Sequence, residues 1–497
     1  MGAERARVER HEQALMKAEA AIAAMRDKAA RDPCRNQYHF MAPAGWVNDP
    51  NGLIQYKGEY HLFYQHNPYG DRWSAMHWGH ANSTDLVHWK HLPIALAPSE
   101  PYDFDERGGC FSGSAVDDNG VLSLLYTGTV VRDGQSIQSQ CLATSPDGIR
   151  FEKYGKNPVI AHPPVEGSVD FRDPKVWKHE DTWYMVVGSC KDGRGKALLY
   201  RSTDLRQWDY VNVLAESDGN LGTMWECPDF FSLGDKDVLM FSPMGMGSTK
   251  TVYLVGKLDY NSGKFTWDVQ GEVDIGFDFY APQTLLDDKG RRIVIGWGNS
   301  WDSKGFAPPW QKDWCGSMSF PRTVELDQDA RLKFSPVEEI AALREERWVC
   351  GEQRVGADME MVLDEPNGAA WEMIAEFDLT RSDAEEFGFK FRVSPDGTEE
   401  TVLCYFPSTG TLKFDRSRSD GWSEGICERR LEMSGQNKLK LHILMDTSMV
   451  EIFCNEGRTV MTHTLYPHSD SPGTRLFSRS GTACMTSLQC WKLRSIW

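Results

Sequence analysis

The segment GLIQYKGEYHLFYQ, residues 52–65, contains two runs rich in apolar and aromatic residues on either side of a polar turn at Lys57-Gly58. Such a pattern predicts a tight β-hairpin, because glycine, asparagine and aspartate suit the turn. It returns four more times, at Asn119-Gly120, near Glu180, near Asp235 and at Lys289-Gly290. The turns are 54 to 62 residues apart, and each unit has room for about four strands. Residues 33–335 are therefore predicted to form a five-bladed β-propeller.

The rest of the chain lacks this long period. Alternating strands such as WEMIAEFDL and KLKLHILMD follow one another every 8 to 15 residues after a short helical stretch at 336–345, which predicts a β-sandwich over residues 346–497. Good helix formers over residues 10–30 predict a helix that Pro33 ends. The fold class is thus all-β, with a short N-terminal helix in residues 1–32 that docks on the main body.

Composition limits the classes of function. The chain has 54 basic and 72 acidic residues, a net charge of −18, which disfavours nucleic acid and anionic membrane surfaces. Apolar runs fall short of the roughly 18 residues that a membrane span needs. The N-terminus shows no apolar core of a secretory signal, and the twelve cysteines include no CxxC pair. We therefore expect free thiols, a cytoplasmic location and no binding to nucleic acid or membrane.

The repeat also predicts where the chemistry lies. The first strand of each propeller blade lines the central axis, so polar groups early in different blades converge on one pocket. Asp49, Asp173 and Glu226 lie 9, 7 and 9 residues before their hairpin turns, at corresponding positions of three blades. Three carboxylates around one funnel suit glycosidic bond cleavage, which needs one ionised and one protonated carboxyl group. The alternative, that Asp-Pro and Asp-Asn pairs only cap turns, applies less well to three in register.

Three motifs carry a family resemblance. GWVNDPNG at 45–52, FRDP at 171–174 and WECPD at 225–229 resemble glycoside hydrolase family 32, the family of invertases, sucrose-6-phosphate hydrolases, levanases and inulinases. The resemblance runs from about residue 33 to the C-terminus, where Val450–Phe453 and Gly457 look like sandwich strands of the family. It implies a five-bladed propeller followed by a β-sandwich, in agreement with the repeat.

By this resemblance Asp49 matches the nucleophile, Glu226 the general acid/base and Asp173 the stabiliser of the transition state. The implied mechanism is double displacement with retention, for which the Asp49 and Glu226 carboxyl groups should lie about 5–5.5 Å apart. The family's fructose subsite matches a further set of positions: Asn48, Gln65, Trp73, Phe111, Ser112, Arg172, Tyr280 and Trp301. The segment around Trp301 is longer and looser than the usual family version.

The resemblance implies a β-fructofuranosidase acting on sucrose, sucrose 6-phosphate or short fructo-oligosaccharides. A fructosyltransferase, an exo-fructanase and, more remotely, a non-catalytic sugar-binding protein are alternatives on the same fold. No cofactor is expected. No metal is expected either, because His77, His80 and His88 lack a completing carboxylate cluster and fit structural roles better. The N-terminal helix or an open sandwich edge could support a homodimer.

Overall fold

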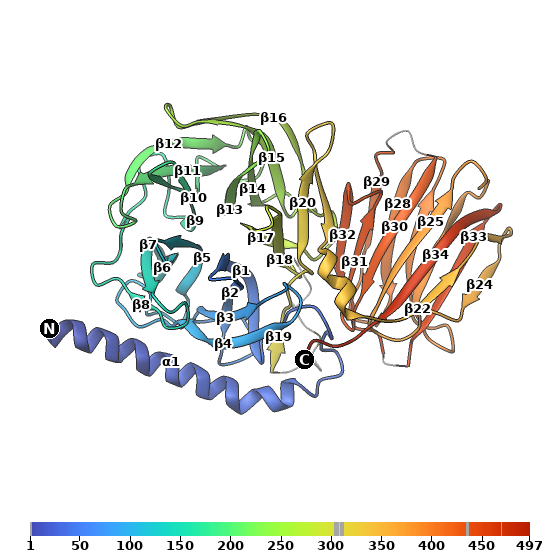
Figure 1. Ribbon diagram of the computed structural model, residues 1–497, viewed down its shortest axis with the longest axis horizontal. Helices are drawn as coiled ribbons and strands as arrows, with labels where there is room; N and C mark the ends of the chain where they lie inside the picture. The colour runs from blue at the N-terminus through green and yellow to red at the C-terminus, as the bar shows by residue number, and fades with distance from the viewer. Residues whose placement is uncertain (1, 303–307, 309–312, 434–436, 469) are drawn as a thin grey trace.

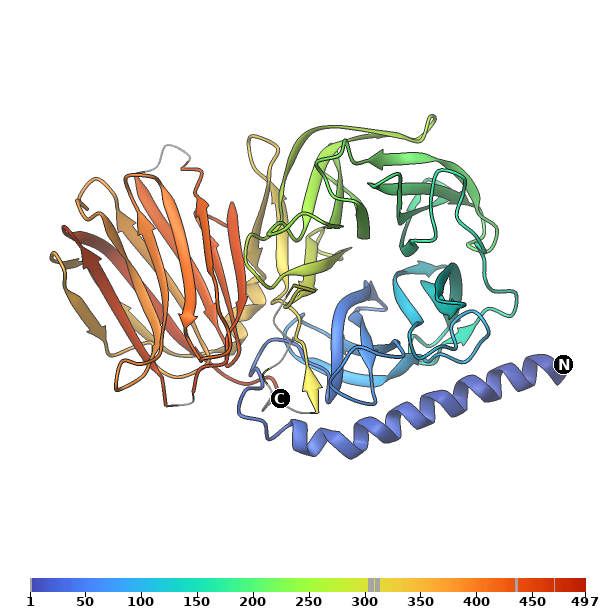
Figure 2. The same ribbon diagram turned by 180° about the vertical axis from the view of Figure 1, so that it is seen from behind.

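The computed structural model describes residues 2–302, 308, 313–433, 437–468 and 470–497. A ring of five small sheets stands beside a two-layer sandwich, and helix α1 (Gly2–Ala29) runs along one side of the ring (Figure 1). Seen from behind, the C-terminus lies close to the junction of the two β domains (Figure 2). The predicted all-β class with propeller, sandwich and N-terminal helix is confirmed.

Each blade is an antiparallel sheet whose hairpins follow the repeat. Blade I contains β1 (Gly45–Tyr56), β2 (Glu59–Asn67), β3 (His77–Ser83) and β4 (Trp89–Leu96), and blade II contains β5 (Gly109–Asp118), β6 (Val121–Arg132), β7 (Gln135–Ser145) and β8 (Glu152–Lys153). Blade III contains β9 (Phe171–His179), β10 (Thr182–Lys191), β11 (Arg194–Ser202) and β12 (Asp209–Glu216). Blade IV contains β13 (Met224–Leu233), β14 (Lys236–Met244), β15 (Val252–Asp259) and β16 (Lys264–Glu272). Blade V contains β17 (Tyr280–Leu286), β18 (Arg292–Trp297), β20 (Arg322–Leu326) and β21 (Leu332–Pro336).

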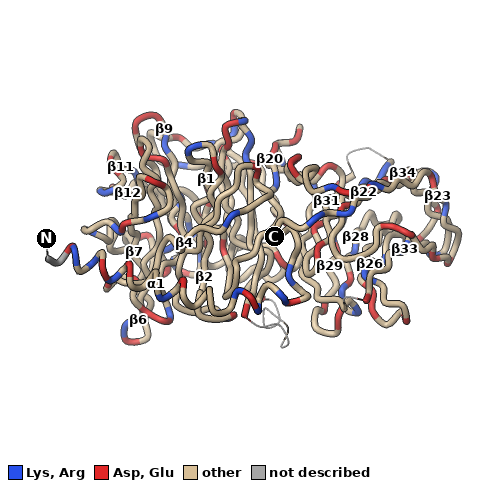
Figure 3. The backbone as a smooth tube through the Cα atoms, turned by 60° about the horizontal axis from the view of Figure 1, so that its bottom comes forward, with Lys and Arg blue, Asp and Glu red and all other residues tan. Residues whose placement is uncertain are grey.

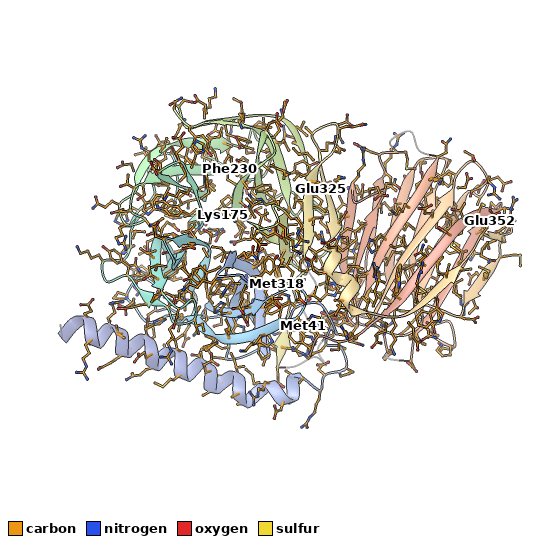
Figure 4. All side chains as sticks on the ribbon, in the orientation of Figure 1. Met41, Lys175, Phe230, Met318, Glu325 and Glu352 are labelled. Carbon is orange, nitrogen blue, oxygen red and sulfur yellow. The ribbon has the colours of Figure 1, made fainter. Side chains whose placement is uncertain are left out.

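The chain leaves blade V before completing it. β19 (Trp314–Cys315) pairs in parallel with the start of β1, so a late segment joins the first blade and closes the ring. The first strands of neighbouring blades contact one another around the axis, as the repeat predicts. Lys175 lies close to this axis (Figure 4), where its Nζ bonds Asp229 Oδ2 at 2.8 Å and the Thr284 carbonyl oxygen at 2.7 Å. Buried polar groups thus fill the channel.

Two sheets form the sandwich after a 3-10 turn at Glu338–Leu343. One sheet orders β22 (Arg344–Cys350), β34 (Ala483–Leu493), β25 (Trp371–Asp378), β30 (Lys438–Met445), β31 (Met449–Cys454) and β32 (Thr459–Thr464), with β23 (Gln353–Val355) also on β34. The other orders β24 (Glu360–Leu363), β33 (Gly473–Arg479), β26 (Glu386–Val393), β27 (Glu400–Phe406), β28 (Thr411–Arg418) and β29 (Ile426–Arg430). Apolar side chains that alternate along these strands fill the space between the sheets.

Helix α1 begins earlier than the expected residue 10. Its first turns contain good helix formers and an Arg5–Glu9 ion pair at i,i+4 spacing, which support the extra length. Ala18 and Ile22 are buried against Ile94 of the edge strand β4, so the expected docking is confirmed. None of the helices among the described residues has the length and hydropathy to span a membrane.

Lysine and arginine positions and aspartate and glutamate positions are interspersed along the backbone of both β domains (Figure 3). One group of charged side chains is fully buried between the domains. Arg322 of the propeller bonds Glu451 of the sandwich at 2.7 Å, and His39 bonds Asp446 at 2.9 Å and Glu451 at 3.1 Å. None of the twelve cysteines, all of which are among the described residues, is in a disulfide.

Candidate active site

A cavity of about 560 Å³ opens at the end of the propeller axis where the first strands begin. Among the residues that line it are all three predicted carboxylates and the eight further positions named from the sequence: Asn48, Asp49, Gln65, Trp73, Phe111, Ser112, Arg172, Asp173, Glu226, Tyr280 and Trp301. All five blades and the loop after β18 thus contribute to one site. The expected convergence of early blade positions is observed.

The sequence predicted that all three carboxylates occupy equivalent positions in their blades. In the structure, Glu226 is one residue out of register with Asp49 and Asp173. Arg172, Glu226 and Tyr280 are 54 residues apart and lie two positions before Pro174, Pro228 and Pro282, whereas Asp49 and Asp173 directly precede a proline. The positions after Arg172, Glu226 and Tyr280 all have positive φ, at 66°, 48° and 50°. The counts to the hairpin turns conceal this offset because the strands differ in length and each carries a bulge nearby.

Asp49 is held from three sides at the bottom of the cavity. Ser112 Oγ donates to its Oδ2 at 2.6 Å and Asn48 Nδ2 donates to its Oδ1 at 3.0 Å, while Trp46 Nε1 fixes Asn48 at 2.7 Å. The Cys227 thiol lies 3.4 Å from the same Oδ2. Burial raises the pKa of Asp49, and the bonds from Ser112 and Asn48 oppose that rise. Donors on both oxygens therefore orient this carboxylate and favour its ionised form.

Asp173 lies beside Asp49, and the negative charges of both Glu226 and Asp49 act on it. Its Oδ2 accepts a bond from the Cys227 backbone N–H at 2.9 Å, and its own N–H bonds Thr127 Oγ1 at 3.0 Å. Burial, despite the opposing charge of Arg172, raises the pKa of Asp173 to about 7, with Glu226 and Asp49 adding to the rise. The Asp173 carboxyl group is therefore closer to protonation at neutral pH than an exposed aspartate is.

Glu226 is hydrogen-bonded on both carboxylate oxygens by the residues at the equivalent positions of the two neighbouring blades. Arg172 donates to Glu226 Oε1 through Nη2 at 2.9 Å and Nε at 3.2 Å, and Tyr280 Oη donates to Oε2 at 2.6 Å. Arg172 is itself held from outside by Asp170 at 2.7 Å. The Glu226 side chain keeps 16% exposure, so it borders the open part of the cavity.

Aromatic rings form the walls. Trp73 and Phe111 meet edge to face with centroids 5.8 Å apart, and Trp301 packs against Trp297 at 5.0 Å. Trp301 lies in the cavity despite the unusual length of its segment, of which residues 303–307 and 309–312 lie outside the described residues. Flat apolar walls around a polar floor suit a sugar ring, whose C–H faces stack on aromatic rings.

Sequence reasoning missed several residues of the cavity. Gln138 Oε1 accepts a bond from Arg172 Nη1 at 3.4 Å. Met244 at the end of β14 also lines the cavity, as do Thr249 and Lys250 of the connection to β15. Lys250 is 7% exposed and forms an ion pair with Asp302 across to blade V. The connection carries no motif, so only the buried lysine near a glycine-rich turn could have indicated it.

A carboxylate-lined funnel on a five-bladed propeller, with a β-sandwich behind it, defines a glycoside hydrolase architecture. The family models for the glycosyl hydrolases family 32 N-terminal domain and C-terminal domain match residues 39–336 and 339–492. The chain belongs to glycoside hydrolase family 32. It is an invertase-type glycosidase that cleaves fructofuranosides.

Individual relatives agree with this assignment. A sucrose-6-phosphate hydrolase from Escherichia coli is 42% identical over 481 residues, covering 92% of this chain and 94% of that protein. A raffinose invertase from Escherichia coli is 40% identical over 476 residues, with coverage of 92% and 94%. A β-fructofuranosidase from Bombyx mori, solved as a mutant in complex with sucrose, superposes with a TM-score of 0.83 at 35% identity, covering 98% of this chain and 99% of that one.

Proposed function

We propose that the chain is a retaining β-fructofuranosidase in which Asp49 attacks the anomeric carbon of the fructosyl group. Glu226 donates a proton to the leaving oxygen and then activates the water that releases fructose. The observation that carries this proposal is the arrangement of the carboxylates: Asp49 is held by donors on both oxygens, while Glu226 borders the opening. A nucleophile needs fixed orientation and an acid needs access to the leaving group.

Asp173 fits a third role in this mechanism. It lies beside Asp49, where the Cys227 N–H and thiol both reach its Oδ2 at 2.9 Å and 3.5 Å. A carboxyl group held there can bond fructosyl hydroxyls, and bonds that strengthen in the transition state lower the barrier. The proposed fructose subsite also contains Asn48, Gln65, Trp73, Phe111, Ser112, Tyr280 and Trp301.

The names and complexes of the relatives suggest sucrose 6-phosphate and sucrose as substrates of this chain. Several relatives bear the name sucrose-6-phosphate hydrolase, at 36–42% identity. Lys250 provides a cation on the cavity wall formed by the connection after β14, in the same blade as Glu226. We place the leaving glucosyl group on this side, where a phosphate on it would meet Lys250. The twelve free thiols fit a cytoplasmic enzyme, since the cytosol keeps thiols reduced.

Side-by-side kinetics tests the proposal. Sucrose, sucrose 6-phosphate, raffinose and inulin are assayed for released fructose and for longer transfer products by chromatography. We expect both sucrose substrates to be hydrolysed, with little transfer and slow release from inulin. Lys250→Met should lower kcat/KM for sucrose 6-phosphate about tenfold more than for sucrose, since a charged contact is lost only for the former. Absence of fructose release from all four substrates by the folded protein would refute the proposal.

A further inference from the structure

A second cavity, of about 390 Å³, lies where the segment after α1 meets the sandwich. Its wall combines residues of that segment with residues of sandwich strands and loops, among them Cys34, Gln37, Arg392, Thr447, Tyr466 and His468. It shares no lining residue with the active-site cavity. Among the described residues that line it there is an arginine and a histidine but no carboxylate, in a chain whose net charge is −18.

The arginine has no counter-ion within the described part of the chain. Arg392 is 3% exposed, and its Nε and Nη2 donate only to carbonyl oxygens, of Ser471 at 3.0 Å and His468 at 3.4 Å. Its Nη1 is buried and has no hydrogen-bond partner. The carboxylates of Glu399 and Asp446 act on Arg392 electrostatically, but neither forms an ion pair with it. A buried cation without a matching anion costs several kcal/mol, so the fold keeps this guanidinium against a considerable penalty.

The backbone at Arg392 adds to that penalty. The pairing of β26 with β33 shifts register between Lys390 and Val393, and Arg392 has a φ of 51° within this bulge. The left-handed conformation costs a non-glycine residue about 1–2 kcal/mol. Strained residues of this kind cluster at ligand sites, where the surrounding structure holds a side chain in position for binding.

A histidine stands at the exposed edge of the cavity. The His468 side chain is 75% exposed, and its Nδ1 bonds Glu399, which raises the pKa of the imidazole. Glu399 also accepts a bond from Ser471 Oγ at 2.7 Å, so its charge is directed to these two donors. The Asp446 carboxylate does not line the cavity and accepts bonds from His39 and from the Gln37 and Thr447 backbone N–H groups.

We propose that this cavity binds a hexose phosphate, with the phosphate group against Arg392 and His468. The Nη1 group of Arg392, which has no partner among the described residues, can donate to phosphate oxygens, and a protonated His468 would add a further charge-assisted bond. The volume of this cavity falls within the range of roughly 300–1,000 Å³ that small-molecule sites occupy. It is larger than an inorganic ion alone would fill. The Thr447 hydroxyl and the Tyr466 ring offer contacts for the sugar part. This inference does not depend on the function proposed for the first cavity.

Calorimetric titration of the full-length protein tests the proposal with three probes: glucose 6-phosphate, inorganic phosphate and glucuronate, a carboxylate of similar size. We expect glucose 6-phosphate to bind tightest. Arg392→Met should weaken it by about tenfold or more and His468→Gln by about threefold, as lost charge-assisted bonds predict. Both variants should hydrolyse sucrose at the wild-type rate. Lys250→Met is the matched control, because it removes a cation from the catalytic cavity instead.

Several results would overturn the proposal. Equal binding to wild type and Arg392→Met would exclude the site, and loss of binding in Lys250→Met alone would place the ligand in the catalytic cavity. Glucuronate or inorganic phosphate binding as tightly as glucose 6-phosphate would exclude recognition of a hexose phosphate. If Arg392→Met does not fold, Arg392→Lys, which keeps the charge but loses the paired donors, and His468→Gln decide by the same comparison.

Discussion

Two groups of carboxylates lie in the interior of this protein, and they differ in the cations that bond them. In the active-site cavity, Arg172 bonds Glu226, and burial raises the pKa values of Asp49 and Asp173. Between the domains, Asp446 and Glu451 are as deeply buried, yet bonds to His39 and Arg322 lower their pKa values. Burial raises the pKa of Asp274, which also bonds Arg322, so cations offset burial for two of these three carboxylates.

The interdomain group is well supplied with donors. Arg322 bonds Glu451 at 2.7 Å and Asp274 at 2.9 Å, and both ring nitrogens of His39 face carboxylates. A histidine whose two nitrogens both donate must be protonated, and these bonds raise the pKa of His39 to about 9 despite its burial. We therefore expect this group to stabilise the domain contact and the carboxylates of the active-site cavity to cost stability.

The largest effect should come from the catalytic group. Asp49→Asn keeps the size of the side chain and its bond to Ser112 but removes the proposed nucleophile, so we expect kcat for sucrose to fall by at least about 10⁴-fold. The unfolding midpoint should hardly change. Asp235→Asn, an exposed aspartate at the hairpin tip of the same domain, is the control and should keep full activity. Activity within tenfold of wild type in Asp49→Asn would remove Asp49 from the mechanism.

Arg322→Met should give the opposite result, with loss of stability and retained activity. It leaves Glu451 and Asp274 buried without their guanidinium, which should lower the free energy of unfolding by about 3–5 kcal/mol. The matched control is Arg429→Met, which breaks the half-exposed pair with Glu272 and should cost at most about 1 kcal/mol. Denaturant unfolding measures both. Equal small losses in the two variants would show that the buried group does not stabilise the contact.

The stability that His39 contributes should depend on pH in a defined window. Its folded pKa of about 9 exceeds the ordinary 6.5, so its contribution is complete below pH 6.5 and disappears as the pH rises through 9. The free energy of unfolding should fall over this window by up to about 1.4 kcal/mol per pH unit relative to His39→Gln. Parallel pH profiles for wild type and variant would contradict a protonated His39.

Asp173→Asn should make the protein slightly more stable while it impairs catalysis. A carboxyl group whose folded pKa is about 7 rather than 3.8 destabilises the fold progressively between those pH values and fully above pH 7. The variant should therefore melt about 2 °C higher at pH 8, and no higher near pH 4. A lower melting temperature at pH 8 would mean that Asp173 is compensated like the interdomain carboxylates.

The sequence alone predicted the catalytic group better than the interdomain group. Periodic hairpins placed Asp49, Asp173 and Glu226 in one funnel, because blade repetition converts sequence spacing into spatial convergence. The sequence did not reveal that Glu226 is offset by one residue, because a bulge after Glu226 makes the residue count to the hairpin turn misleading. The His39–Asp446 contact joins residues 407 positions apart in two domains, and no periodicity links them. Lys250 and Arg392 lie in connections and bulges that follow no repeat.

The stereochemistry of fructosyl transfer tests the central claim most directly. Sucrose is hydrolysed in the presence of methanol, and the methyl fructoside that forms first is identified by NMR. Double displacement through Asp49 predicts methyl β-D-fructofuranoside beside free fructose, and neither product with Asp49→Asn. Formation of the α anomer, or fructose release at the normal rate with no methyl fructoside, would show direct displacement by water and contradict the roles assigned to Asp49 and Glu226.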